Sequence, residues 1–293
     1  MFIRKSILLL TMCFPLVCLP LSDVYESYID KYAPLAVEHR ERFGIPASVT
    51  LAQGLLESAA GRSTLAKKGN NHFGIKCHST WTGDTLLRDD DAAQECFRAY
   101  ATAEESFLDH SKFLTRGRYR PLHDIPVEDY AGWARGLKSC GYATDPNYAE
   151  RLIAIIERYG LNAFDSGSGD HSLTADFIFD NLRRSHTVRK NRGLHYVIAT
   201  PGDTYSSIAR EFSISLSRIL SYNDVEKDCP VRDWEEVYLE SKSDHAPKGM
   251  KKITVGETDD LHSISQRLGM KTASLRKLNP DGEIEPGRTL KLR

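Results

Sequence analysis

The sequence predicts an α+β protein in which a mainly helical domain with a small β-lobe is followed by two short βααβ repeats. Apolar residues recur at helical spacing in the first half of the chain, and one short segment there has the character of a hairpin. The second half contains one strand-helix-helix-strand pattern twice. A chain of 293 residues has room for two or three such domains.

The composition is that of an ordinary globular protein, with 41% hydrophobic and 27% charged residues. The formal net charge is −1 and the sequence pI is about 6.8. Bulk electrostatics therefore give no reason to expect a nucleic-acid partner.

The amino terminus has the pattern of a secretory signal peptide, which we place at residues 1–22. Two basic residues, Arg4 and Lys5, precede the apolar run 7–21, and a polar sequence follows. Two prolines interrupt the run, which disfavours a spanning helix, although an uncleaved membrane anchor is the alternative. We expect export to the periplasm, cell envelope or exterior, without stable membrane insertion after cleavage.

Four cysteines remain after that segment: Cys77, Cys96, Cys140 and Cys229. An oxidising compartment permits disulfides, and Cys77 and Cys96 flank a short segment in which they could close a hairpin. Four cysteines allow three full pairings, so the connectivity stays open. The chain has no Cys-x-x-Cys pattern, and we expect no metal and no organic cofactor.

The helical domain is predicted from several periodic segments. Ile45, Val49, Ala52 and Leu56 recur at steps of four, three and four, which marks one buried helix face. Further helices are expected at 103–114 and 146–159, and an antiparallel hairpin precedes them at 80–100. Residues 164–194 are predicted to be a linker, because "DSGSGDHS" has a flexible composition that should separate independently folded parts.

The repeat begins at Gly202 and again at Gly256. Gly-Asp-Thr in the first copy matches Gly-Glu-Thr in the second, and Ser-Ile pairs follow in both. An asparagine closes the second helix of each copy, at Asn223 and Asn279. Apolar strands precede and follow the helices in both copies.

This repeat resembles LysM modules, at residues 195–240 and 251–293. The resemblance implies binding to polysaccharides that contain N-acetylglucosamine, chiefly peptidoglycan or chitin. Two linked copies would strengthen such binding, because the second contact becomes intramolecular. The alternative is that one copy is degenerate and lacks a working sugar groove. The second copy has two extra residues between Thr258 and Ser263, which favours this alternative for it.

Glu57 is the candidate catalytic acid. On a helix, Thr50, Gln53 and Glu57 share a line that flanks the buried stripe. Such an edge should desolvate the carboxyl group and raise its pKa, as a general acid at neutral pH requires. A solvated surface glutamate is the plainer alternative.

Two stretches resemble the glucosaminidase family of peptidoglycan hydrolases (glycoside hydrolase family 73): "AQGLLESAAGRSTLAKKGNNHFGIK" and "GYATDPNYAERL". The resemblance spans about 35–161 and implies a lysozyme-like catalytic domain, which we place at 23–163. It implies Glu57 as the general acid and Tyr142 as the cleft tyrosine, with Tyr148 as the less favoured alternative.

The second carboxylate is expected in the β-lobe. Asp89, Asp90, Asp91 and Glu95 are the candidates, and we favour Asp90. A run of aspartates is also typical of a solvated turn. Alternatively, the acetamido group of the substrate could act as the nucleophile.

Five further residues are predicted to bind substrate. Two of them have an equally good alternative interpretation. The asparagine would then cap a turn, and the tryptophan would pack in the core of the lobe. The five are Gln53, Asn71, Phe73, Trp81 and Tyr148.

The sequence thus predicts an exported enzyme that cleaves the β-1,4 bond after N-acetylglucosamine in peptidoglycan strands and is held on the wall by its LysM pair. The alternatives are a non-catalytic wall-binding or scaffold protein and a lytic transglycosylase, which also uses a Glu-Ser pair on a helix. The Tyr-Ala-Thr-Asp sequence argues against the transglycosylase. The sequence leaves open any protein partner, the oligomeric state and the cellular process.

Overall fold

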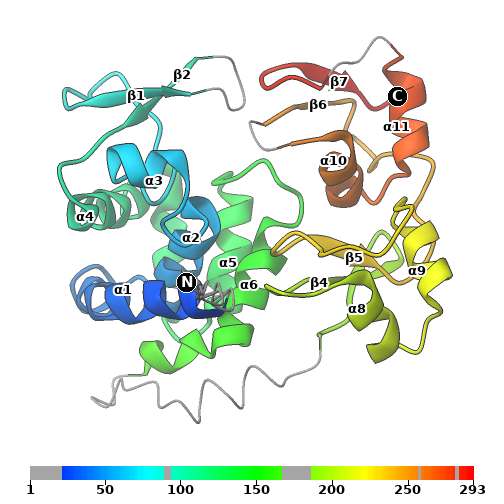
Figure 1. The fold of residues 1–293 in the computed structure, drawn as a ribbon. Helices are drawn as coiled ribbons and strands as arrows, with labels where there is room; N and C mark the ends of the chain where they lie inside the picture. Colours follow the sequence, from blue (N-terminus) through cyan, green and yellow to red (C-terminus); the bar gives the residue numbers. More distant parts are fainter. Residues whose placement is uncertain (1–21, 89–93, 167–185, 257–258, 281–283) are drawn as a thin grey trace, which may run out of the picture.

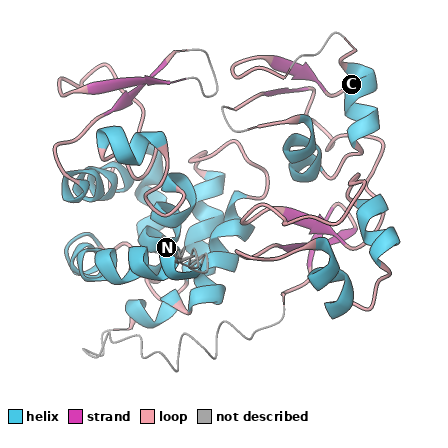
Figure 2. Ribbon diagram, viewed as in Figure 1, coloured by secondary structure: helices cyan, strands magenta, loops and turns pink. Residues whose placement is uncertain are grey.

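The computed structural model describes a helical domain followed by two small α/β modules (Figure 1). Helices gather in the first half of the chain, and the strands form three separate small sheets (Figure 2). The mixed fold class predicted from the sequence is confirmed. The described residues are 22–88, 94–166, 186–256, 259–280 and 284–293. The predicted signal peptide at 1–22 therefore lies outside them except for its last residue.

The helical domain is built around α2 (Ala47–Ser58), which is buried along most of its length. α2 packs against α1 (Ser22–Phe43) and α6 (Tyr148–Tyr159). Gly54 permits the close approach to α1, because a Cβ there would lie 2.5 Å from the Tyr28 hydroxyl. The remaining helices are α3 (Thr64–Gly69), α4 (Ala103–Leu114), η1 (Gly117–Asp124), α5 (Tyr130–Ser139) and η2 (Leu161–Asp165).

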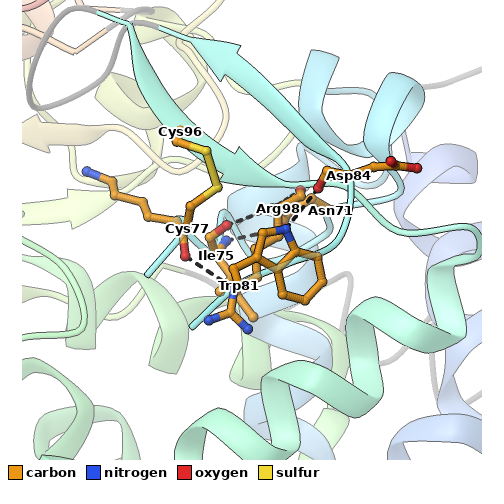
Figure 3. Close-up of a disulfide and its surroundings, with 8 residues drawn as sticks. Asn71, Ile75, Cys77, Trp81, Asp84, Cys96 and Arg98 are labelled. Atoms are coloured by element: carbon orange, nitrogen blue, oxygen red, sulfur yellow. Dashed lines mark hydrogen bonds between the residues drawn. A yellow bond between two sulfur atoms is a disulfide. The ribbon is translucent and has the colours of Figure 1, made fainter. Parts of the chain in front are cut away.

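The predicted hairpin is present as β1 (Thr85–Arg88) and β2 (Glu95–Arg98), with Thr85 opposite Arg98. A disulfide joins Cys77 to Cys96 (Figure 3). The structure selects this pairing because the Cys77 segment lies beside β2, where the Cys77 amide donates to the Cys96 carbonyl at 2.7 Å. Cys140 and Cys229 are free thiols.

Both repeats have the predicted strand-helix-helix-strand order. The first contains β4 (Leu194–Ile198), α8 (Tyr205–Glu211), α9 (Leu216–Tyr222) and β5 (Glu236–Tyr238). The second contains β6 (Lys252–Thr254), α10 (Leu261–Leu268), α11 (Thr272–Leu278) and β7 (Thr289–Lys291).

The repeated asparagine has the same task in both copies. The Asn223 amide donates to the carbonyls of Ile219 and Tyr238, and its oxygen accepts from the Tyr238 amide. Asn279 makes the equivalent three bonds to Leu275 and Lys291. Each asparagine therefore ties the end of the second helix to the last strand.

The helix caps show where the two copies differ in length. Thr204 and Asp260 cap the first helix of each copy, and each forms a capping box with the serine three residues later. The two extra residues of the second copy therefore lie between its glycine and its cap. This aligns Thr204 with Asp260, whereas the sequence match had aligned Thr204 with Thr258.

The structure departs from the predicted linker at both of its ends. Phe164 and Asp165 are buried in the helical domain, and Asp165 accepts hydrogen bonds from the amide and hydroxyl of Ser48. At the other end, β3 (Arg189–Asn191) pairs with β4 and extends the sheet of the first repeat. Residues 167–185, within the predicted linker, lie outside the described residues.

The first repeat packs directly against the helical domain, and whether the two parts fold independently stays a prediction. The Trp234 indole lies 5.7 Å from the Tyr25 ring of α1 and 6.0 Å from the Tyr159 ring of α6, measured between ring centroids. Tyr196 and Tyr238 of the repeat belong to the same buried cluster as the helical core. The repeat therefore buries these three aromatic side chains against the helical domain, beyond the small core that it forms by itself.

The second repeat is joined to the first in the same way. The Gln266 side-chain amide donates to the Asn223 side chain and to the Glu236 backbone carbonyl. The Gln266 backbone carbonyl accepts from the Tyr238 hydroxyl at 2.9 Å. Lys242, between the repeats, is buried and pairs with Asp224 at 3.0 Å. Among the described residues, no helix is both long enough and apolar enough to cross a membrane.

Candidate active site

A cavity of about 460 Å³ opens beside the carboxyl end of α2. Its walls come from three stretches that are distant in sequence: the end of α2, residues 73–78, and residues 141–151. The second half of α4 and the start of η1 complete the wall through Phe113, Arg118 and Tyr119. Both stretches of sequence that resemble the glucosaminidases therefore meet at this cavity.

Glu57 reaches the cavity because of its place in the last turn of α2. Leu56 and Glu57 are the only residues of this helix that are not buried, and both line the cavity. The helix ends directly afterwards, with Ala59 in the left-handed conformation at φ 50°. The structure thus places Glu57 where the apolar helix meets solvent, as the periodicity predicted.

A chain of hydrogen bonds runs from the protein interior to Glu57. The Tyr148 hydroxyl donates to Glu57 Oε1 at 2.8 Å, and it accepts from Gln53 Nε2 at 3.0 Å. The Gln53 oxygen lies 3.1 Å from His110 Nε2. Since the glutamine oxygen can only accept, His110 carries its proton on Nε2.

His110 is the innermost member of this series of hydrogen bonds, and its ring is neutral. It is fully buried on α4, and burial lowers its pKa to about 3. Its ring stacks on Phe73 with 3.8 Å between centroids. His110 was not predicted from the sequence; its spacing on α4 marks only a buried helix face.

Tyr148, rather than Tyr142, contacts the candidate acid. Burial raises the pKa of both tyrosines well above the usual value, and the negative charge of Glu57 adds to the effect. Both hydroxyls therefore keep their protons and can donate. The Tyr142 hydroxyl donates to the Phe73 carbonyl at 3.2 Å, and its ring stacks on Tyr148 at 5.6 Å. Both tyrosines line the cavity, and the assignment of Tyr142 as the cleft tyrosine stays a prediction.

Gln53 and Asn71 are buried, so direct contact with substrate is not supported for either. Asn71 donates to the carbonyls of Ile75 and Arg98, and its oxygen accepts from the Ile75 amide. Its amide group is thereby used to fold residues 71–75 against β2. This corresponds to the alternative interpretation of a turn cap.

Phe73 lines the cavity, although its side chain is almost fully buried. Trp81 does not line the cavity and lies in the β-lobe (Figure 3). Its indole nitrogen donates to the Asp84 carbonyl at 3.0 Å, and Arg98 lies over its ring at 4.7 Å. The structure therefore gives Trp81 its alternative role, in the packing of the lobe.

The structure describes only one of the four candidates for the second carboxylate. Asp89, Asp90 and Asp91 lie outside the described residues. Glu95 is described, and it pairs with Lys76 at 2.6 Å without lining the cavity.

Among the described lining residues, the carboxylates are Glu57 and Asp145. Asp145 was not singled out from the sequence, although it belongs to "GYATDPNY". Arg151 lies 3.4 Å from Asp145 and also makes two hydrogen bonds to the buried Glu236 of the first repeat. The Asp145 side chain therefore faces a fixed positive charge. No group of three or more potential metal-ligating side chains occurs in the described part of the chain.

Comparison with known proteins finds a family match for the helical domain and for both repeats. Residues 33–161 match the glucosaminidase family, described as mannosyl-glycoprotein endo-beta-N-acetylglucosaminidase. Residues 197–231 and 253–293 match the LysM domain family.

Among similar proteins, exo-glucosaminidase LytG of Bacillus subtilis is 34% identical over 49% of this chain and 54% of its own. Peptidoglycan hydrolase FlgJ of Vibrio parahaemolyticus is 29% identical over 46% of this chain and 48% of its own. This chain thus spans about half the length of these curated relatives.

A solved peptidoglycan hydrolase from Sphingomonas sp. A1 is 30% identical, with a TM-score of 0.42, over 49% of this chain and 96% of that one. The family matches cover both stretches around the cavity and both repeats. The helical part of this chain belongs to the glucosaminidase family of glycoside hydrolases, and two LysM modules follow it.

Proposed function

We propose that this protein is an exported peptidoglycan hydrolase that cleaves the β-1,4 bond between N-acetylglucosamine and N-acetylmuramic acid. One observation carries the proposal: Glu57 lies in the wall of the cavity and is held from behind by Tyr148. The printed names of the relatives, exo-glucosaminidase and peptidoglycan hydrolase, support the same reaction and substrate.

In the proposed reaction, Glu57 protonates the oxygen of the departing sugar as positive charge develops on the N-acetylglucosamine ring. Tyr148 holds the Glu57 carboxyl in one orientation, since Gln53 and His110 fix its own hydroxyl. After bond cleavage the Tyr148 proton donor also stabilises the ionised carboxylate that remains.

The partner of Glu57 in catalysis is proposed to be Asp90, with Asp89 as the next candidate. If neither acts, the acetamido oxygen of the substrate can attack its own ring carbon. Tyr142 is proposed to contact the sugar through its ring edge, because its hydroxyl is occupied by the Phe73 carbonyl.

The LysM modules are proposed to hold the enzyme on the wall and to keep the cavity close to the glycan. The proposal of export rests on the amino-terminal apolar run, and the Cys77–Cys96 disulfide is consistent with an oxidising compartment. No cofactor is part of the proposed mechanism.

Digestion of purified peptidoglycan tests the proposal directly. Products should carry new reducing N-acetylglucosamine ends, which mass spectrometry after borohydride reduction identifies. 1,6-Anhydro-muramyl ends would instead assign the protein to the lytic transglycosylases. Folded protein that pellets with the wall but yields no new ends would support the scaffold alternative.

A further inference from the structure

A second cavity, of about 380 Å³, lies on the α4–η1 side of the molecule. It adjoins the catalytic cavity, because His78, Phe113, Arg118 and Tyr119 line both. A ligand that fills the catalytic cavity can therefore extend into the second one without leaving the protein surface.

The lining of this second cavity is strongly basic. Four cationic side chains line it, and the only carboxylate among its described lining residues is Asp109. Asp109 is already used, since one of its oxygens accepts from Arg98 at 2.6 Å and from the Tyr100 hydroxyl at 2.7 Å. The other three cations are Lys112, Arg116 and Arg118.

These three cations have no carboxylate partner within the described part of the chain. Lys112, Arg116 and Arg118 are all exposed, and Arg118 is held by the neighbouring Tyr119, over whose ring it lies at 5.1 Å. Cations gathered along a concave wall raise the local concentration of anions there. Uncompensated charge beside a reaction cavity therefore favours an anionic part of the substrate.

The glycan backbone itself does not supply that anion. Its sugars are neutral wherever the lactyl group of the muramyl residue is joined to peptide by an amide bond. The peptide arms of peptidoglycan do supply it, since they branch from alternate sugars and carry free carboxylates. With N-acetylglucosamine at the cleaved bond, the sugar on either side of it carries such an arm.

We propose that the cavity formed by Lys112, Arg116 and Arg118 binds a carboxylate of the peptide arm on the muramyl residue next to the cleaved bond. This inference rests on the proposed function and adds a specificity site to it. The enzyme then discriminates between glycans by the charge of their peptides, although no peptide bond is broken.

The test compares three soluble glycans with the full-length protein: one with free-carboxyl peptides, one with the same peptides amidated, and one stripped of peptides by an amidase, whose freed lactyl carboxylates are then converted to amides. Arg116→Glu is the test variant, and Arg120→Glu is its control. Arg120 is also exposed and lies on η1, but it does not line either cavity. Both variants change the net charge equally.

The wild type should have its highest kcat/KM on the free-carboxyl glycan. Arg116→Glu should lower that value by about twofold to fivefold, the scale of exposed charge pairs, mainly through KM. It should leave hydrolysis of the stripped glycan unchanged, and Arg120→Glu should retain the wild-type preference. Added salt should reduce the preference, because exposed charges are screened.

Equal kcat/KM of the wild type on all three glycans would overturn the carboxylate site while leaving the proposed function intact. Equal losses in Arg116→Glu and Arg120→Glu on every glycan would also overturn it, as a long-range charge effect. No cleavage of any glycan by the folded wild type would instead contradict the proposed function itself. Circular dichroism of both variants confirms that they are folded.

Discussion

Replacing Glu236 with glutamine tests whether the first LysM module is part of the catalytic domain's structure. The Glu236 side chain is fully buried and receives hydrogen bonds from Arg151 at 2.8 and 3.0 Å and from Asn147 at 3.1 Å. Removing one partner of a buried ion pair costs about 3–5 kcal/mol, because the other charge stays buried. Asp145 still compensates part of the Arg151 charge at 3.4 Å, so we expect the lower limit, about 3 kcal/mol.

A loss of about 3 kcal/mol should lower Tm by about 6–12 °C in a protein of this size. Thermal unfolding followed by circular dichroism measures this shift. Arg151 also lines the catalytic cavity one turn after Tyr148, so a displaced Arg151 should disturb the helix that carries the tyrosine. We expect kcat on soluble glycan fragments, where wall binding has no role, to fall by about tenfold.

Glu226→Gln is the matched control, because Glu226 lies in the same module, is exposed and takes part in no described ion pair. It should unfold and react as the wild type does. If Glu236→Gln and Glu226→Gln had the same Tm and the same kcat, the module would be only loosely placed, and the interface would not support the catalytic residues.

Four further predictions concern single features of the site and fold. Glu57→Gln should lower kcat on glycan by about a hundredfold or more while leaving the circular dichroism spectrum and pelleting with peptidoglycan unchanged; retained turnover would remove Glu57 as the acid. Tyr148→Phe should lower kcat by about tenfold. It should also move the basic limb of the pH profile of kcat to higher pH, because the ionised Glu57 carboxylate loses a hydrogen-bond donor. An unchanged profile would contradict the contact. Burial raises the pKa of Asp165 from 3.8 to about 6. The protonated group therefore stabilises the fold below pH 4. Its contribution to the free energy of unfolding, about 3 kcal/mol, is lost as the pH rises through 6. Urea unfolding of Asp165→Asn, whose neutral amide imitates the protonated acid, should therefore vary less with pH across that interval than the wild type; parallel curves would refute the assignment. Replacing both Cys77 and Cys96 with serine should destabilise the β-lobe by about 3 kcal/mol, seen as faster proteolysis of the hairpin, and equal proteolysis rates would show that β1–β2 pairing alone holds the lobe.

Local patterns in the sequence were sufficient for the elements and for the position of Glu57 at the edge of its helix. The four-three-four spacing around Val49 places α2, and the same periodicity places Glu57 at its edge. The repeated asparagines marked both modules, because each one closes its own helix against a strand 12 to 15 residues later. The hairpin was predictable for the same reason, since its two strands are neighbours in the chain.

The tertiary structure decided which side chains support Glu57. Tyr148 lies 91 residues from Glu57, and Gln53 lies 57 residues from His110, so no local spacing relates them. Asn71 and Trp81 have residue types that suit sugar binding, yet both are used in holding the β-lobe together. A polar or aromatic side chain serves either purpose, and only its burial and its partners tell the two apart.

The sequence by itself determined three kinds of unit: a helical domain, a β-hairpin lobe, and two LysM modules. It could not determine how these units dock, because a composition typical of a flexible linker carries no information about the surfaces on either side of it. The tertiary structure decided that Glu236 reaches Arg151 across 85 residues of sequence. The physical reason is that the core of a small module leaves part of its surface to be covered. Tyr196, Trp234, Tyr238 and Glu236 are buried where the first module meets the helical domain.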